Sequence, residues 1–156
     1  MKLNQNIFRA NDIRGIAYED LTEEVVQSLG RALGSEAIDR NIQKFIIGRD
    51  GRLSSPEIFD WLSSGIMSTG CNVIDIGIVT SPMFYHSTYE LNSSSGVVIT
   101  GSHNPGNYNG FKIVFNNHST SSEEILNLKQ RILEENFREG NLSLIHISEP
   151  TRHDQI

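Results

Sequence analysis

Three short apolar runs, separated by signals for helix starts, constrain the fold of this 156-residue chain most strongly. The runs lie at residues 44–48, 72–77 and 96–100, and their length and β-branched content are typical of buried strands. A further strand is predicted at residues 111–115. Ser-Pro pairs at residues 55–56 and 81–82 are typical of the first turn of a helix. This alternation of strand and helix predicts a layered α/β domain with a mostly parallel sheet.

The predicted helices carry aliphatic residues at helical spacing, which we expect to form the core. The first helix begins after Thr22, a typical N-cap residue that is followed by two acidic residues. Ser55 is the predicted cap of the second helix, and residues 121–124 form a capping box for the last one. The inner positions are Val25, Val26, Leu29, Leu33, Ile58, Phe59, Leu62, Ile66, Ile125, Leu128, Ile132 and Leu133.

Composition excludes several classes of partner. Hydrophobic content of 37% and charged content of 21% are ordinary for a soluble globular domain. A net charge of -6 disfavours nucleic acid, which needs clustered basic residues. No apolar run is long enough to span a membrane, and the N-terminus lacks an apolar secretory core. We therefore expect a cytoplasmic protein, in which the single cysteine, Cys71, is a packed residue.

The end of the third apolar run is the strongest candidate for chemistry. Residues 100–112 read Thr-Gly-Ser-His-Asn-Pro-Gly-Asn-Tyr-Asn-Gly-Phe-Lys, so a buried strand stops close to Ser102 and a turn-rich loop follows. Rigid loops of this kind often carry functional residues. The same residues are also explained by a polar turn in which Ser102 and Asn104 cap backbone groups.

A serine hydrolase is not favoured, although His103 follows Ser102 directly. Serine needs an adjacent base, and sequence neighbours on a loop rarely place the imidazole on the preceding hydroxyl. The nucleophile elbow Gly-x-Ser-x-Gly is absent, because Asn104 is followed by Pro105. The glycine-rich phosphate loop and the dinucleotide fingerprint are absent as well.

An anionic substrate would need a local group of cations in a chain of net negative charge. Four basic residues near the polar motifs are candidates: Arg14, Arg49, Arg52 and Lys112. Arg52 is explained at least as well by a structural ion pair with Asp50.

Four segments, in order along the chain, resemble the first domain of the α-D-phosphohexomutase family. They are Phe-Arg-Ala-Asn-Asp-Ile-Arg-Gly at residues 8–15, Gly-Arg-Asp-Gly-Arg-Leu-Ser at 48–54, Gly-Ile-Val-Thr-Ser-Pro at 77–82, and residues 100–112, called the serine loop below. The resemblance implies a three-layer α/β/α domain around a mixed sheet over residues 1–141, the first of four domains in the full enzyme. It implies an isomerase that interconverts hexose 6-phosphate and hexose 1-phosphate.

The resemblance also implies roles for individual residues. In the family, the serine equivalent to Ser102 is phosphorylated, contacts Mg²⁺ and donates its phosphoryl group to a sugar monophosphate. A sugar 1,6-bisphosphate forms, turns over and returns the other phosphoryl group. Arg14 and Lys112 would then steady the transferring group, Lys112 with an acid–base share, and His103 would act as a polar or general acid–base contributor. Asp12 is expected to orient Arg14.

Asn104 and Asn109 are assigned by the same resemblance to the substrate and phosphate site. Their residue type favours a second role, which is to shape the loop. Mannose and glucose phosphates are the expected substrates, because the opening motif resembles the phosphomannomutase/phosphoglucomutase branch. A phosphoglucosamine mutase and a non-catalytic phosphosugar-binding module are the alternatives; the intact serine loop with Arg14 and Lys112 speaks against the latter.

Other motifs of the family do not occur in this chain. Its Asp-Gly-Asp-Gly-Asp-Arg metal loop, its Gly-Glu-x-Ser-Gly sugar loop and its distal phosphate loop belong to the later domains. We therefore expect the remaining Mg²⁺ ligands in a second domain, and we expect this chain alone to be inactive.

The last residues resemble something other than a protein family. Residues 142–152 are similar to the conceptual translation of a transposase adaptor used in sequencing libraries. This implies that the natural frame is interrupted near Asn141 and that residues 142–156 are a non-native tail. The alternative is a genuine short strand at residues 144–147.

Overall fold

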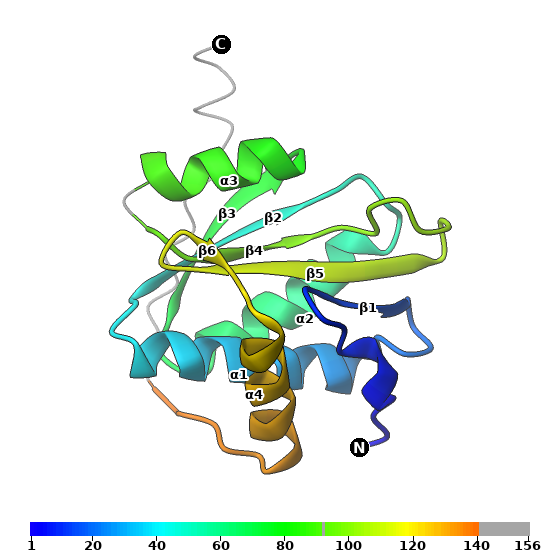
Figure 1. Cartoon of the computed structure of the whole chain (residues 1–156), viewed down its shortest axis with the longest axis horizontal. Helices are drawn as coiled ribbons and strands as arrows, with labels where there is room; N and C mark the ends of the chain where they lie inside the picture. Colours follow the sequence, from blue (N-terminus) through cyan, green and yellow to red (C-terminus); the bar gives the residue numbers. More distant parts are fainter. Residues whose placement is uncertain (92, 141–156) are drawn as a thin grey trace.

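A computed structural model describes residues 1–91 and 93–140 of the chain. The predicted non-native tail, residues 142–156, lies outside the described residues. The domain has three layers, with α1, α2 and α4 on one face of a sheet and α3 on the other (Figure 1). The elements are η1 (Gln5–Ile7), β1 (Ile13–Ile16), α1 (Glu23–Asp39), β2 (Lys44–Arg49), α2 (Ser55–Met67), β3 (Asn72–Ile78), α3 (Ser81–Glu90), β4 (Gly96–Ile99), β5 (Tyr108–Phe115), β6 (His118–Ser119) and α4 (Ser122–Leu133).

The sheet has the order β1-β5-β4-β2-β3, and β6 pairs with β5. β2 pairs in parallel with β3 and β4, while β5 is antiparallel to β4, β1 and β6. Among the described strands, only β5 runs against the others. The predicted α/β/α domain with a mixed, mostly parallel sheet is therefore confirmed.

The order of the parallel strands reverses at β2. The chain passes from β2 through α2 to β3 on one side, and from β3 through α3 to β4 on the other side. The loops that follow β2 and β4 consequently leave the carboxyl ends of two adjacent strands. In open α/β sheets, such a switch point is the usual place for a ligand. Here it brings residues 50–54 beside the serine loop.

Alternate residues of each strand enter two separate cores. Ile47 and its same-face neighbours pack under α1, α2 and α4, whereas Ile46 and Phe84 belong to a smaller cluster under α3. The predicted inner positions of the helices are buried, with one exception. Leu133 is 46% exposed, and it occupies the last position of α4. Cys71 is fully buried, as expected.

Helix starts follow the capping signals in all but one case. Thr22 caps α1, and Ser121 forms the predicted reciprocal capping box with Glu124. The prediction for α2 was wrong: Ser54 is its N-cap residue, and it makes no capping hydrogen bond. The Ser55 hydroxyl instead donates to the carboxylate at position 50 over 2.7 Å. The start of α2 is thereby tied to the loop after β2.

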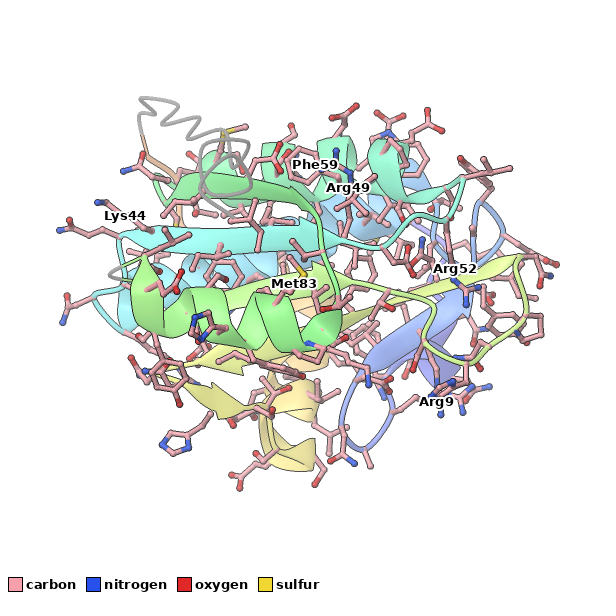
Figure 2. All side chains as sticks on the ribbon, turned by 90° about the horizontal axis from the view of Figure 1, so that it is seen from above. Arg9, Lys44, Arg49, Arg52, Phe59 and Met83 are labelled. Atoms are coloured by element: carbon pink, nitrogen blue, oxygen red, sulfur yellow. The ribbon has the colours of Figure 1, made fainter. Side chains whose placement is uncertain are left out.

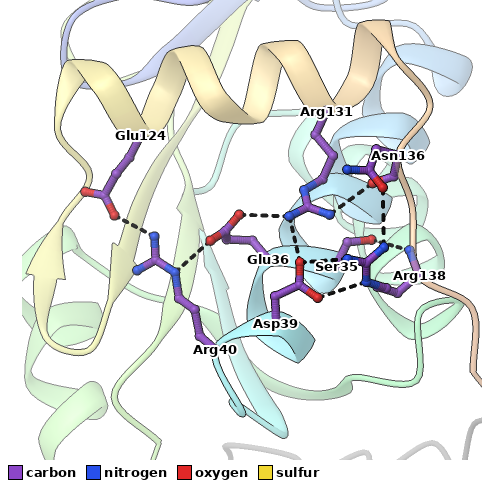
Figure 3. Close-up of polar contacts among 8 residues, drawn as sticks. All are labelled: Ser35, Glu36, Asp39, Arg40, Glu124, Arg131, Asn136 and Arg138. Carbon is purple, nitrogen blue, oxygen red and sulfur yellow. Dashed lines mark hydrogen bonds and ion pairs between the residues drawn. The ribbon is translucent and has the colours of Figure 1, made fainter.

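Ion pairs hold α4 against α1 (Figure 3). Arg131 contacts Glu36 at 3.2 Å and Asp39 at 2.9 Å, and Arg40 contacts Glu36 at 2.9 Å and Glu124 at 2.8 Å. Burial alone would raise the pKa of Asp39, but hydrogen bonds and charge from two arginines outweigh it and lower that pKa. The Asp39 carboxylate thus stays ionised and paired with both arginines.

The segment after α4 uses the same network. Arg138 binds Asp39 through its guanidinium, and its backbone N–H donates to the Ser35 hydroxyl over 2.8 Å. Farther on, the Gly140 N–H donates to the Ser68 carbonyl at the end of α2. The described chain therefore ends packed along α1 and α2.

Glycines allow α1 and α2 to pack closely. A Cβ at Gly65 would overlap the carbonyl oxygen of Gln27, and one at Gly30 would overlap that of Leu62. Both obstacles are backbone atoms, so neither can move aside like a flexible side chain.

We expect Gly65→Ala to lower the free energy of unfolding by about 1–3 kcal/mol, because overpacking outweighs the gain of up to about 1 kcal/mol in helix propensity. Urea denaturation measures the change. Gly51→Ala is the matched control, since a Cβ there meets no atom within 4 Å. Equal stability of the two variants would show that the helices separate without cost.

Candidate functional site

Ser102 lies three residues beyond β4, at the carboxyl end of the parallel strands, and its side chain is exposed. Its φ is 53°, in the left-handed region that L-residues other than glycine rarely adopt. This conformation costs about 1–2 kcal/mol for a residue with a Cβ. The Ser102 N–H donates to the Thr100 hydroxyl over 3.0 Å. The surrounding contacts must therefore fix the loop in this shape.

Arg52 supplies most of those contacts from the loop after β2. Its guanidinium donates hydrogen bonds to four backbone carbonyl oxygens of the serine loop. The acceptors are Ser102 at 3.0 Å, Asn104 at 2.8 Å, Tyr108 at 3.1 Å and Pro105. Figure 2 shows Arg52 beside this loop, beyond the end of β2. The side chain is only 17% exposed.

Asp50 completes the link between the two loops. One carboxylate oxygen accepts the Gly101 N–H at 2.9 Å and lies 3.3 Å from Arg52 Nε; the other accepts the Ser55 hydroxyl. Burial alone would raise the pKa of Asp50, but hydrogen bonds from Ser55, Gly101, Arg52 and Thr100 outweigh it and lower the pKa. The predicted structural pairing of Arg52 with Asp50 is confirmed.

Asn109 is fully buried beneath the serine loop. Its amide nitrogen donates to the hydroxyls of Ser54 and Ser55, each at 2.9 Å, and its oxygen accepts the Gly110 N–H. Of the two roles expected for Asn109, shaping the loop fits this position. The other role, a direct contact with substrate phosphate, does not fit, because no part of the amide is accessible.

The loop itself carries two more of the predicted residues. His103 is exposed and follows Ser102 directly. Asn104 is half-buried, and its amide nitrogen donates to the Gly101 carbonyl over 2.9 Å. Asn104 therefore shapes the loop in the structure. Its contact with a phosphate stays a prediction.

Arg14 and Lys112 come together through the antiparallel pairing of β1 with β5. Arg14 lies opposite Gly110, and Lys112 is two residues farther along β5 on the same face. The Gly110 carbonyl also accepts the N–H of Thr100, two residues before Ser102. Lys112 therefore lies on β5, next to the strand that leads to Ser102, and Arg14 lies one strand farther out, on β1.

A pocket of about 490 Å³ opens on this face of the sheet. Besides Arg14 and Lys112, it is lined by Arg9, Asp12, Tyr85 and Thr120, among others. Three cations thus face a single carboxylate. Asp12 lies 3.9 Å from Arg14 Nε, a distance consistent with its predicted orienting role.

Two buried polar atoms of the pocket make no hydrogen bond within the described residues. They are Arg14 Nε and Thr120 Oγ1. Buried donors of this kind are usually satisfied by protein, water or ligand. Together with the surplus of positive charge, they suit an anionic ligand. The sequence reasoning missed Arg9, although it belongs to the same motif as Arg14.

Arg49 lies away from this site. It pairs with Asp75 at 3.3 Å, and its guanidinium lies 5.1 Å from the centre of the Phe59 ring. Figure 2 shows Arg49 beside Phe59 and apart from Arg52. Of the four predicted cations, only Arg14 and Lys112 line the pocket.

The described residues do not fit a magnesium site by themselves. Mg²⁺ prefers about six oxygen ligands, whereas Ser102 offers one hydroxyl and Asp50 is engaged in the hydrogen bonds given above. Within residues 1–91 and 93–140, no group of three His, Cys, Asp or Glu side chains has a geometry suited to a metal.

A separate finding concerns membranes: no described helix is both long and apolar enough to cross one.

Comparison with known proteins identifies the family. Residues 5–139 match the family model of the phosphoglucomutase/phosphomannomutase α/β/α domain I. The chain belongs to this family. It is 44% identical, over 88% of its length and 30% of the relative's, to a phosphomannomutase/phosphoglucomutase of Pseudomonas aeruginosa. It is 37% identical, over 99% of its length and 34% of the relative's, to a phosphoglucomutase of Neisseria gonorrhoeae.

A solved structure agrees with this assignment. A phosphoglucomutase/phosphomannomutase family protein of Burkholderia thailandensis superimposes with a TM-score of 0.90 and 34% identity, over 97% of this chain and 35% of that one. The chain thus spans about a third of the length of its relatives. It corresponds to domain I of the phosphoglucomutase/phosphomannomutase family.

The lowered pKa of Asp50 leads to a pH-dependent contribution to stability. A carboxyl with a lower pKa in the folded state stabilises the fold above its unfolded pKa of about 3.9, and that contribution is lost as the pH falls through the folded value. We expect Asp50→Asn to be clearly less stable than wild type at pH 7, with a gap that narrows below about pH 4.

Urea denaturation of both proteins from about pH 3 to about pH 7, a range that brackets the ordinary pKa of a carboxyl group, measures the difference in their free energies of unfolding. Asp60→Asn, an exposed carboxylate of α2, serves as the control. A gap that stayed constant with pH would contradict the ionised state assigned to Asp50.

Proposed function

We propose that this chain is the phosphoserine domain of a cytoplasmic phosphohexomutase that interconverts hexose 6-phosphates and hexose 1-phosphates of glucose and mannose. The observation that carries the proposal is the presentation of Ser102. Its hydroxyl is exposed at the switch point of the sheet, on a loop fixed by Arg52 and Asp50. Membership of the family supports the reaction class.

The proposed reaction is a reversible transfer of one phosphoryl group. The bond between phosphorus and Ser102 Oγ breaks while a bond to the free hydroxyl of the sugar monophosphate forms. That hydroxyl loses its proton, and the serine oxygen regains one. The resulting 1,6-bisphosphate turns and returns its other phosphoryl group to Ser102. No oxidant or reductant is required.

The residues around the loop divide the remaining tasks. Positioning and charge neutralisation dominate such transfers. Arg14 and Lys112, two of the three basic residues of the pocket, would steady the transferring group. The proton of the sugar hydroxyl would pass to Lys112 or His103, since the latter is exposed next to the serine.

Mg²⁺ belongs to this proposal as a cofactor whose other ligands lie outside the chain. Ser102 would contribute one oxygen ligand, and the acidic loop implied by the family resemblance would contribute carboxylates. The ion supplies Lewis-acid stabilisation of the phosphoryl oxygens when it is bound.

The Ser102 proposal is tested on the full-length gene product. We expect the wild-type protein to carry the mass of one phosphate and Ser102→Ala to lack it, with the loss of nearly all turnover of glucose 1-phosphate, because the phosphoryl carrier is gone. Ser64→Ala, an exposed serine on α2, should keep both properties. An unmodified, inactive wild type would instead support a non-catalytic phosphosugar-binding module.

The chain of residues 1–156 alone should show no mutase activity, because residues 1–91 and 93–140 contain no group of three His, Cys, Asp or Glu side chains that could hold Mg²⁺. A coupled assay with glucose 1-phosphate and Mg²⁺ measures this, with the full-length protein as the positive control. Turnover by the short chain above that of its Ser102→Ala variant would contradict the prediction.

A further inference from the structure

We propose that Arg52 is a positioning residue for phosphoryl transfer: it sets the place of Ser102 without binding the substrate. This inference rests on the proposed function of Ser102 as the phosphoryl carrier. It assigns a role in the reaction to a side chain of a different loop, the one that follows the neighbouring strand β2.

The contacts of the guanidinium use all three of its nitrogens. One terminal nitrogen donates to Pro105 and Tyr108, the other donates to Ser102 and Asn104, and Nε faces Asp50. Arginine offers five N–H donors in a rigid, planar arrangement. A lysine ammonium at this position has three donors on a single atom, so it cannot reach both pairs of carbonyls at once.

The loop is built around this side chain. A Cβ at Gly101 would overlap the central carbon of the Arg52 guanidinium. The glycine before the reacting serine is therefore needed to make room for Arg52. The left-handed conformation of Ser102 follows immediately, and the Ser102 carbonyl is itself one of the acceptors.

The same contacts suit the electrostatics of the transfer. Carbonyl oxygens carry partial negative charge, and unneutralised ones near Ser102 would repel a phosphoryl group. Arg52 binds four of them, while Asp50 balances its charge. Arg52 thus removes a local repulsion but adds little net attraction for substrate. That task falls to Arg14 and Lys112 in the pocket.

This division predicts a distinct kinetic effect. In the full-length gene product, Arg52→Gln and Arg52→Lys should lower kcat for glucose 1-phosphate by about a hundredfold, because a misplacement of about 1 Å is enough for such a loss. KM should change by less than about threefold, since the groups that bind the ground state remain in place. The lysine variant should fail to rescue kcat.

The matched control is Arg49→Lys. Arg49 is also a partly buried arginine with a carboxylate partner, but it has no contact with the serine loop. Its kcat should stay within about twofold of wild type. Thermal unfolding of every variant separates loss of activity from loss of folding. Equal kcat values in a folded Arg52→Gln variant and wild type would overturn the proposal.

Gly101→Ala tests the same contact from the other side. The added methyl group should displace the guanidinium and lower kcat as Arg52→Gln does. If the two residues act through one contact, the double variant should be hardly slower than either single variant. Multiplicative losses would show that the two residues act independently, against the proposal.

Hydrogen exchange of the same proteins does not depend on activity. Peptides that cover residues 100–110 should exchange faster in Arg52→Gln than in wild type or Arg49→Lys. Unchanged exchange would overturn the anchoring role. An inactive wild type whose loop loosens in Arg52→Gln would refute the proposed function, and with it the catalytic meaning of the anchor. An active wild type with an unaffected Arg52→Gln would refute the inference alone.

Discussion

The ion pair between Asp50 and Arg52 is the contact on which the arrangement of the site depends. Both residues belong to the loop after β2, yet their partners lie in the loop after β4. Asp50 holds the Gly101 N–H, and Arg52 holds the carbonyls that follow it. The conformation of Ser102 is therefore set from the neighbouring strand. Because Asp50 also binds Ser55, the start of α2 is part of the same support.

The basic residues of this acidic chain serve two different purposes. Arg49 and Arg52 each have a carboxylate partner, and their side chains are engaged in packing or in backbone contacts. Arg14 and Lys112 line a pocket in which cations outnumber carboxylates. Their positive charge is therefore not fully neutralised, and it can attract an anionic ligand. Residue type alone does not separate the two groups, because the difference lies in what each side chain touches.

Local patterns predicted much of the fold. The apolar runs and capping signals identified β2, β3, β4 and the helices, since these elements are encoded by their own residues. The strand predicted at residues 111–115 is also confirmed, as the second part of β5. β1 and β6 were missed because neither contains a continuous apolar run, and both are defined by hydrogen bonds to β5. The cap of α2 was misplaced by one residue, since the Ser55 hydroxyl donates to the Asp50 carboxylate in the preceding loop. The pairing of Arg52 with Asp50 was accessible because the two residues are close in sequence.

The sequence by itself determined the class of fold, the family, and the place of Ser102 at the end of a buried strand. Those properties reside in local periodicity and in contiguous motifs. Only the tertiary structure decided that Arg14 and Lys112 share a pocket with Arg9, and that Asn109 is buried. Both facts depend on the register of β5 with its neighbours, which is fixed by the packing of the two faces of the sheet. Contacts between distant segments are set by that register, so no single motif contains them.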